Sequence, residues 1–343
     1  MKTQAVIVTG AGGVGKTTVA TALALTAARA GRRTLVVTVD PARRLADAIG
    51  IELDDEPRPL PGEPSLWAAM LDASGSWRAV AARHTDPETA RRLVESEFFA
   101  AAASHFPASQ SYAAAEEAAN FIESKVWDLV VIDTPPAAGG IDFFTAPGQM
   151  ADLVGGRLLR LLTGGRLPGR KFIFERTARP MLRVADSILG SNLLERVAAF
   201  LMDLRTTYDG VSRRAAEIEV HLRRAVTIVV TTADPTPIRE AVRFFRELPE
   251  VASRPRAVIF NRSLPESWAG AEPPPRTNLE LVENLARWGQ EAHRQAEARR
   301  EFAARYRARV TSIPWLAHPP TDVTALAGML GQAEGFDLEA LGI

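Results

Sequence analysis

Short apolar segments separated by helical patterns are the main feature of the hydrophobic pattern along the chain. The segments are rich in Val and Ile and nearly continuous rather than alternating. Such runs are typical of parallel strands covered on both faces. We predict strands at 5–9, 34–39, 128–132, 226–231, 257–260 and 310–313, with 66–71 as a candidate for a further strand.

Helical patterns lie between these segments, as crossovers between parallel strands require. We expect helices over 17–30, 235–248 and 278–307, and two longer helical stretches over 77–124 and 149–222. In the last of these, apolar residues recur at helical spacing. The pattern predicts an α/β fold with a mostly parallel sheet flanked by helices. We assign 1–148 and 223–343 to its core, and 149–222 to an inserted helical subdomain.

Composition narrows the function classes. The 343 residues suffice for two domains or one large domain with an insertion, and 46% are apolar. Lys and Arg (41) balance Asp and Glu (41), so net charge gives no case for a nucleic-acid partner. The absence of Cys excludes thiolate metal sites and disulfides. Without a signal peptide or a run long enough to span a bilayer, the sequence predicts a soluble cytoplasmic protein.

A phosphate-binding motif connects the first predicted strand to the first predicted helix. Residues 10–17, GAGGVGKT, match G-x-x-x-x-G-K-[ST] in the strand–helix context that the motif needs. The glycines allow consecutive backbone N–H groups to form an anion nest, to which the helix dipole adds. Lys16 would then bridge the β- and γ-phosphates, and the Thr17 hydroxyl would bind Mg²⁺.

The same residues also fit the dinucleotide fingerprint G-x-G-x-x-G, and Asp40 lies where a ribose-binding carboxylate would be expected. Two features favour a nucleoside triphosphate instead. Lys16 and Thr17 follow the glycines directly, in a chain with only four lysines. Asp40 is followed by Pro41, which opens a second loop.

Two aspartates follow later strands. Asp40 follows the second predicted strand and Asp133 follows the strand at 128–132. Ligands bind beyond the carboxyl ends of parallel strands, so both loops should meet the phosphate-binding loop. Asp133 could hold Mg²⁺ through water, and Asp40 could orient or deprotonate the attacking water. The alternative role for each is a helix cap or a turn.

Five segments recur in the order of a known family: GAGGVGKTT, TVDPARRLADA, WDLVVIDTPP, VVTTADP and IFNR. They resemble the ArsA/Get3 family, the arsenite-pump and tail-anchored-protein-targeting ATPases of the deviant Walker A class. An ArsA-like, anion-transporting ATPase subgroup of actinobacterial type is the most similar. The resemblance implies a P-loop NTPase fold with a twisted sheet and a helical insertion. It also implies ATP and Mg²⁺ as cofactors, and a dimer that depends on ATP.

The resemblance also implies roles for individual residues. Asp40 matches the catalytic Asp, and Lys16 matches the catalytic Lys that binds the phosphates. Thr17 and Asp133 match the residues of the Mg²⁺ site. Asn261 matches the Asn that recognises adenine. The implied nucleotide contacts are Gly12, Gly13, Val14, Gly15, Lys16, Thr17, Thr18, Asp234, Asn261 and Pro314.

Three departures from the family pattern affect the expected activity. Ala11 occupies the position of the first Lys of the deviant motif, which reaches the partner's phosphates; such a cation is worth about 10³–10⁵ in rate when it acts in trans. Arg43 or Arg44 could replace it, or they could simply be a solvated helix start. Without Cys there is neither a thiolate arsenite site nor the family's zinc site. With one phosphate-binding loop, two active sites need a homodimer or a heterodimer with a related ATPase.

The helical insertion is the expected contact region for a membrane-protein client or a membrane partner. Its apolar side chains could line a groove for an apolar helix or form the core of the subdomain itself. These side chains are Leu158, Leu159, Leu161, Leu162, Phe172, Ile173, Phe174, Met181, Ile188, Leu194, Phe200 and Met202.

Two other functions remain open. One is a positioning ATPase of the MinD/ParA kind, although 322–343 carries none of the Lys or Arg that a membrane-binding helix would use. The other is a slow ATP-binding subunit that regulates a catalytic relative, which Ala11 favours.

Overall fold

The structure is a computed structural model that describes residues 2–39, 44–71, 78, 81–99, 109–135, 137–155, 193–272, 278–320 and 322–343. The chain divides into two compact units. We call the first the sheet unit; it comprises Met1–Leu71, Ala118–Ile141 and His221–Ile343. We call the second the helical unit; it comprises Asp72–Glu117 and Asp142–Val220.

The sheet unit contains one sheet, which has eight strands in the described residues, in the order β3-β4-β2-β5-β1-β6-β7-β8. All neighbouring strands are parallel except β3 and β4, which are antiparallel. The predicted mostly parallel sheet is therefore confirmed. The strands are β1 (Gln4–Gly10), β2 (Thr34–Thr38), β3 (Arg58–Leu60), β4 (Glu63–Met70), β5 (Leu129–Asp133), β6 (Val226–Thr231), β7 (Ala257–Ser263) and β8 (Arg309–Pro314).

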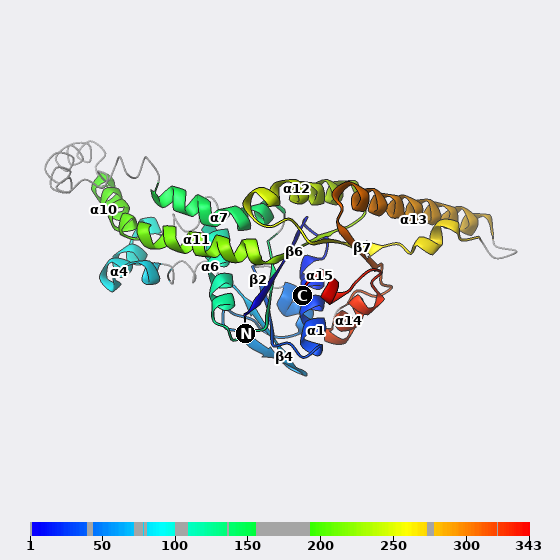
Figure 1. Ribbon diagram of the computed structural model, residues 1–343, viewed down its shortest axis with the longest axis horizontal. Coiled ribbons are helices and arrows are strands. Elements are labelled where there is room, and N and C mark those ends of the chain that lie inside the picture. Colours follow the sequence, from blue (N-terminus) through cyan, green and yellow to red (C-terminus); the bar gives the residue numbers. More distant parts are fainter. Residues whose placement is uncertain are drawn as a thin grey trace. The chain divides into compact units, whose positions relative to one another are not determined.

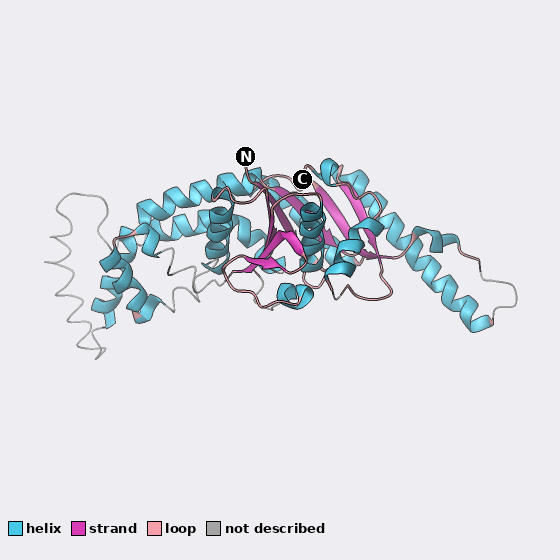
Figure 2. Ribbon diagram, turned by 90° about the horizontal axis from the view of Figure 1, so that it is seen from below, coloured by secondary structure: helices cyan, strands magenta, loops and turns pink. Residues whose placement is uncertain are grey.

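Helices cover both faces of this sheet, which explains the continuous apolar runs (Figures 1 and 2). On one face, side chains such as Val6, Val131 and Ile228 share a buried cluster with Leu23 of α1 and Leu326 of α14. On the other face, Phe302 of α13 packs against Phe245 of α12 and Phe260 of β7. The bounds are α1 (Lys16–Arg29), α2 (Arg44–Ile49), α12 (Pro235–Val251), α13 (Leu279–Tyr306), α14 (Val323–Met329) and α15 (Leu338–Leu341), with 3₁₀ turns at Glu266–Gly270 and Leu330–Gln332.

The described part of the helical unit is built from helices. These are α4 (Pro87–Glu95), α10 (Leu193–Thr206) and parts of α6 (Ser109–Glu123), α7 (Ala137–Gly155) and α11 (Tyr208–Arg224). The predicted helical character of 77–124 and 149–222 holds for the residues described there. Residues 156–192, which include most of the predicted groove side chains, lie outside the described residues. In the described part of the chain, no helix is both long and apolar enough to cross a membrane.

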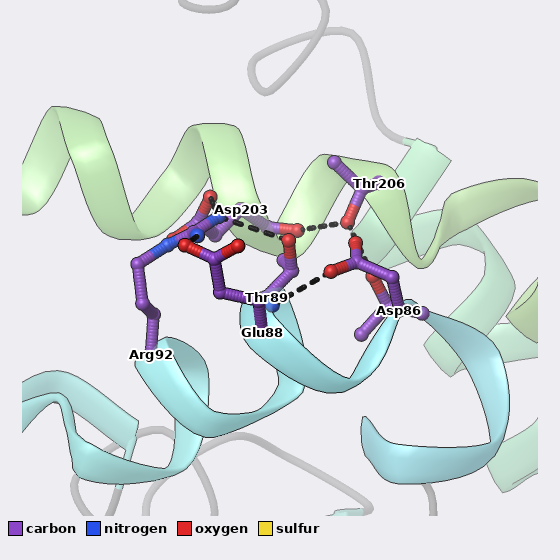
Figure 3. Close-up of polar contacts among 7 residues, drawn as sticks. Asp86, Glu88, Thr89, Arg92, Asp203 and Thr206 are labelled. Carbon is purple, nitrogen blue, oxygen red and sulfur yellow. Dashed lines mark hydrogen bonds and ion pairs between the residues drawn. The ribbon is translucent and has the colours of Figure 1, made fainter.

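A polar network joins α4 to α10 within the helical unit (Figure 3). The Asp86 carboxylate caps α4 by accepting from the Thr89 N–H at 3.0 Å, and this hydrogen bond lowers the pKa of Asp86. Arg92 donates from Nε and Nη2 to the two carboxylate oxygens of Asp203, each at 3.0 Å. Thr206 donates to the Asp203 carbonyl at 2.7 Å. The paired guanidinium–carboxylate geometry fixes the approach of α10 to α4.

A buried carboxylate lies deeper in the same unit. Glu116 of α6 is fully buried and forms an ion pair with Arg83. Nε2 of His84 and Nε of Arg214 lie 3.4 Å and 3.9 Å from its Oε1. Burial alone would raise the pKa of Glu116, but the neighbouring His84 and Arg83 outweigh it and hold the pKa below its ordinary value.

This environment makes the stability of the helical unit depend on Glu116 and on pH. Because the folded-state pKa of Glu116 is depressed, its contribution is present above the unfolded pKa of about 4.3 and is lost as pH falls through the lower folded pKa. Glu116→Gln should lower the free energy of unfolding at pH 7 by about 1–3 kcal/mol and flatten its dependence on pH below about 4.3. Urea unfolding at a series of pH values measures both effects.

Glu117→Gln is the matched control, because Glu117 is more exposed and its contact with Arg83 is longer, at 3.6 Å. Equal effects of the two variants at pH 7, or an unchanged pH dependence in Glu116→Gln, would contradict the assignment.

Candidate nucleotide site

The phosphate-binding loop lies at the centre of the sheet, between the end of β1 and the start of α1. Gly13 and Gly15 have positive φ angles of 75° and 91°, which residues with side chains rarely adopt. Gly15 is the N-cap of α1, and no side chain caps that end of the helix. The first N–H groups of α1 therefore face the loop together with the positive end of its dipole, an arrangement that favours an anion.

Lys16 lies along this loop. Its side chain is buried, with 8% of the residue exposed, and its Nζ donates to the Ala11 carbonyl at 2.9 Å. The ammonium is thus held against the backbone of the phosphate-binding loop, where the predicted phosphates would lie. Because the group is largely removed from water, its interaction with a phosphate would be screened less than at a surface.

Asp133 connects the end of β5 to the end of β2 and to the first turn of α1. It ends β5 and is only 1% exposed. Its Oδ2 accepts from the Thr17 hydroxyl at 2.6 Å and from the Thr38 hydroxyl at 3.0 Å. The predicted convergence of the loops after β1 and β5 is therefore present in the structure. A carboxylate beside a hydroxyl supplies the hard oxygen ligands that Mg²⁺ takes in addition to waters and substrate phosphates, so these residues fit that ion.

The predicted catalytic residue Asp40 lies outside the described residues, as does Arg43. The chain that leads to Asp40 is described: β2 ends at Thr38, and the Val39 N–H donates to the Asp133 carbonyl at 3.2 Å. The backbone directly before Asp40 is thus attached to the end of β5.

Three further predicted nucleotide contacts lie at the carboxyl ends of β6, β7 and β8. Asp234 follows β6 as the N-cap of α12, and it accepts from the Thr232 hydroxyl at 2.7 Å. Asn261 lies in β7 and is buried, whereas Pro314 ends β8. Parallel pairing carries these ends to the same edge as the phosphate-binding loop. The predicted contact Thr18 lies in the first turn of α1.

Two polar residues at this edge are not among the predicted site residues. Thr38 binds Asp133, and Arg294 of α13 donates from Nη1 to the Ala233 carbonyl at 3.0 Å. A hydrogen bond with Glu291 raises the pKa of Arg294, and the charge of Asp234 contributes. The position of Thr38 at the end of a predicted strand was a usable signal. Arg294 was one of many Arg in a helix, so only the fold singles it out.

The profile of a protein family described as anion-transporting ATPase matches residues 3–272. The chain belongs to this family. An uncharacterized protein of Streptomyces coelicolor is 32% identical over 275 residues, which are 77% of this chain and 63% of that protein. A putative arsenical pump-driving ATPase of Halobacterium salinarum is 33% identical over 182 residues, 49% of this chain and 27% of that protein.

A third relative, the ATPase get3 of Aspergillus terreus, is 23% identical over 263 residues, 76% of this chain and 73% of that protein. The chain spans less than two thirds of the first two relatives. These similarities confirm the resemblance to the ArsA/Get3 ATPases that the sequence motifs predict.

Proposed function

We propose that this member of the anion-transporting ATPase family is a Mg²⁺-dependent ATP hydrolase. The observation that carries the proposal is the hydrogen bond between Thr17 and Asp133, which places a hydroxyl and a carboxylate beside Lys16 at the phosphate-binding loop. The names of the pump-driving and get3 relatives as ATPases support it. A dinucleotide-binding site does not require a lysine beside a hydroxyl and a carboxylate, as Lys16 lies beside Thr17 and Asp133 here.

In the proposed mechanism, the backbone of Gly12 to Lys16 holds the phosphates, and Lys16 neutralises charge on the β- and γ-oxygens. Thr17 and Asp133 hold Mg²⁺, which supplies further charge neutralisation when it is bound. Asp40 orients or deprotonates the attacking water. Thr18, Asp234, Asn261 and Pro314 complete the nucleotide contacts.

We further propose that ATP orders the loops after β2 and β5 and that hydrolysis releases them. The acting assembly would be a dimer in the cytoplasm, formed with a second copy or with a related ATPase. Its ATP cycle would be coupled to the targeting of a membrane-protein client or to a membrane partner. The helical insertion remains the proposed contact region. No role for nucleic acid, zinc or thiolate-bound arsenite is proposed.

The strongest second candidate is a slow ATP-binding regulatory subunit. Ala11 favours it, since its methyl side chain is buried, with 7% of the residue exposed, and packs in the buried apolar cluster, while its carbonyl accepts from Lys16. No cation extends from this position towards a partner's phosphates.

Asp133→Asn tests the Mg²⁺ site. We expect about a hundredfold lower turnover at saturating ATP and a higher Mg²⁺ concentration for half-maximal rate, because the amide cannot supply the negative charge. Phosphate release measured against Mg²⁺ concentration gives both values. The control is Asp128→Asn: Asp128 precedes β5 and accepts from the Arg33 N–H, at the other end of the strand.

The same preparations can be compared by light scattering in ATP and in ADP. Turnover with an ATP-stabilised dimer supports a self-sufficient switch. Tight ATP binding without turnover would overturn the stand-alone hydrolase in favour of the regulatory subunit. An unchanged Mg²⁺ dependence in Asp133→Asn would contradict the proposed metal site.

A further inference from the structure

The side chain of Asn261 is bonded to the phosphate-binding loop. Asn261 is 6% exposed, and its Nδ2 donates to the Val14 carbonyl at 2.9 Å. The two residues are 247 positions apart in the sequence. This contact joins β7, on the proposed base side of the site, to the middle of the loop that would hold the phosphates.

A second hydrogen bond determines which way round the Asn261 amide lies. Its Oδ1 accepts from the Arg262 N–H at 3.0 Å. Because only an oxygen can accept there, the NH₂ group must face the Val14 carbonyl. Arg262 has a φ angle of 55°, at a register shift of β7 between Phe260 and Ser263. A positive φ is uncommon for a residue with a side chain and disfavoured relative to the extended backbone around it.

The loop is shaped to accept this contact. A Cβ atom at Gly15 would lie 2.4 Å from Nδ2 of Asn261, so any residue other than Gly would push the amide away. The glycine at this position therefore serves two purposes: it permits the φ angle of 91°, and it leaves room for Asn261.

The contact also controls a donor of the anion nest. The Val14 carbonyl and the Gly15 N–H belong to one planar trans peptide, so they point in opposite directions. A hydrogen bond that holds the carbonyl towards Asn261 therefore holds the Gly15 N–H towards the other side of the loop. Without that bond, the flexible glycines on either side of Val14 would allow this peptide to rotate.

We propose that Asn261 is a positioning residue for the phosphate-binding loop, and that binding of the phosphate chain depends on it whether or not a base is present. The inference rests on the proposed function in that this loop binds ATP. Base recognition and phosphate binding would then be coupled through one side chain. Its amide keeps one N–H and one lone pair for a base.

Inorganic tripolyphosphate separates this role from base recognition, because it has the phosphates of ATP and no base. We expect Asn261→Asp, which puts a carboxylate oxygen against the Val14 carbonyl, to weaken both Mg²⁺–ATP and Mg²⁺–tripolyphosphate by about ten- to a hundredfold. Asn261→Ala, which removes the contact without repulsion, should weaken both ligands less. Isothermal titration calorimetry gives the affinities, and circular dichroism checks folding.

Asn278→Ala is the matched control, because Asn278 is an exposed cap of α13 whose side chain accepts from the Leu281 N–H. If both Asn261 variants lost affinity for ATP but kept their affinity for tripolyphosphate, the positioning role would be overturned. Asn261 would then act in base recognition alone. A wild-type protein that binds neither ligand would overturn the proposed function itself, and this role with it.

Discussion

Lys16→Ala should lower kcat for ATP by at least about 10²–10³, the cost of removing one preorganised donor from developing charge. The side chain is buried against the Ala11 carbonyl, so its charge acts where water screens it least. No other Lys lies within the motif. Lys16→Arg should fail as well, because the planar guanidinium cannot occupy the site of a compact ammonium. Steady-state phosphate release measures the effect.

The control for this prediction is Lys2→Ala. Lys2 is exposed and precedes β1, so its loss should leave turnover within a factor of about two, as for ordinary surface positions. Turnover in Lys16→Ala within about tenfold of the wild type would contradict the proposed role. It would also leave the Thr17–Asp133 pair as the remaining ground for placing the triphosphate at this loop.

Gly10→Ala should have the largest effect on stability, with a loss of at least about 4 kcal/mol in the free energy of unfolding. A Cβ atom there would lie 2.0 Å from the Val230 carbonyl oxygen of the neighbouring strand β6. Gly10 also has a φ angle of 147°. Overpacking costs about 1–3 kcal/mol and occasionally more, and backbone strain a similar amount. Both strands lie in the middle of the sheet, where neither can shift alone.

Gly31→Ala separates steric overlap from backbone strain. Gly31 has a φ angle of 88°, but a Cβ atom at this position would meet nothing within 4 Å in the described part of the chain beyond its own neighbours. Only the left-handed backbone is penalised, at about 1–2 kcal/mol. Urea unfolding of the two variants should therefore give clearly different midpoints. Where Gly10→Ala yields too little folded protein, its soluble fraction relative to Gly31→Ala gives the same comparison. Equal stability of the two variants would contradict the steric argument.

The buried strands were predictable because the central part of the sheet is covered on both faces. β1, β2, β5 and β6 each consist mainly of consecutive buried residues, so apolar runs located them to within one or two positions. The apolar pattern did not predict β3, because this strand has three residues, two of them exposed, and includes Pro59. The short helices α14 and α15 escaped for a similar reason: one or two turns carry too little periodicity.

The sequence by itself determined the parts of the site in which neighbours along the chain act together. The glycines, Lys16 and Thr17 lie within one short segment between a strand and a helix, and local backbone geometry makes such a loop an anion site. Asp133 could be selected for a similar reason, because it directly follows a strand that a continuous apolar run predicts.

Tertiary structure decided which residues distant in sequence lie together at the candidate site. The apolar runs do not determine the order of the strands in the sheet, since any parallel strand buried on both faces has the same pattern. Only the placement of β5 beside β2 brings Thr38 to Asp133. Only the β1–β6–β7 order brings Asn261 to Val14. These hydrogen bonds depend on distances of about 3 Å between atoms far apart in sequence, and such distances follow from packing rather than from spacing along the chain.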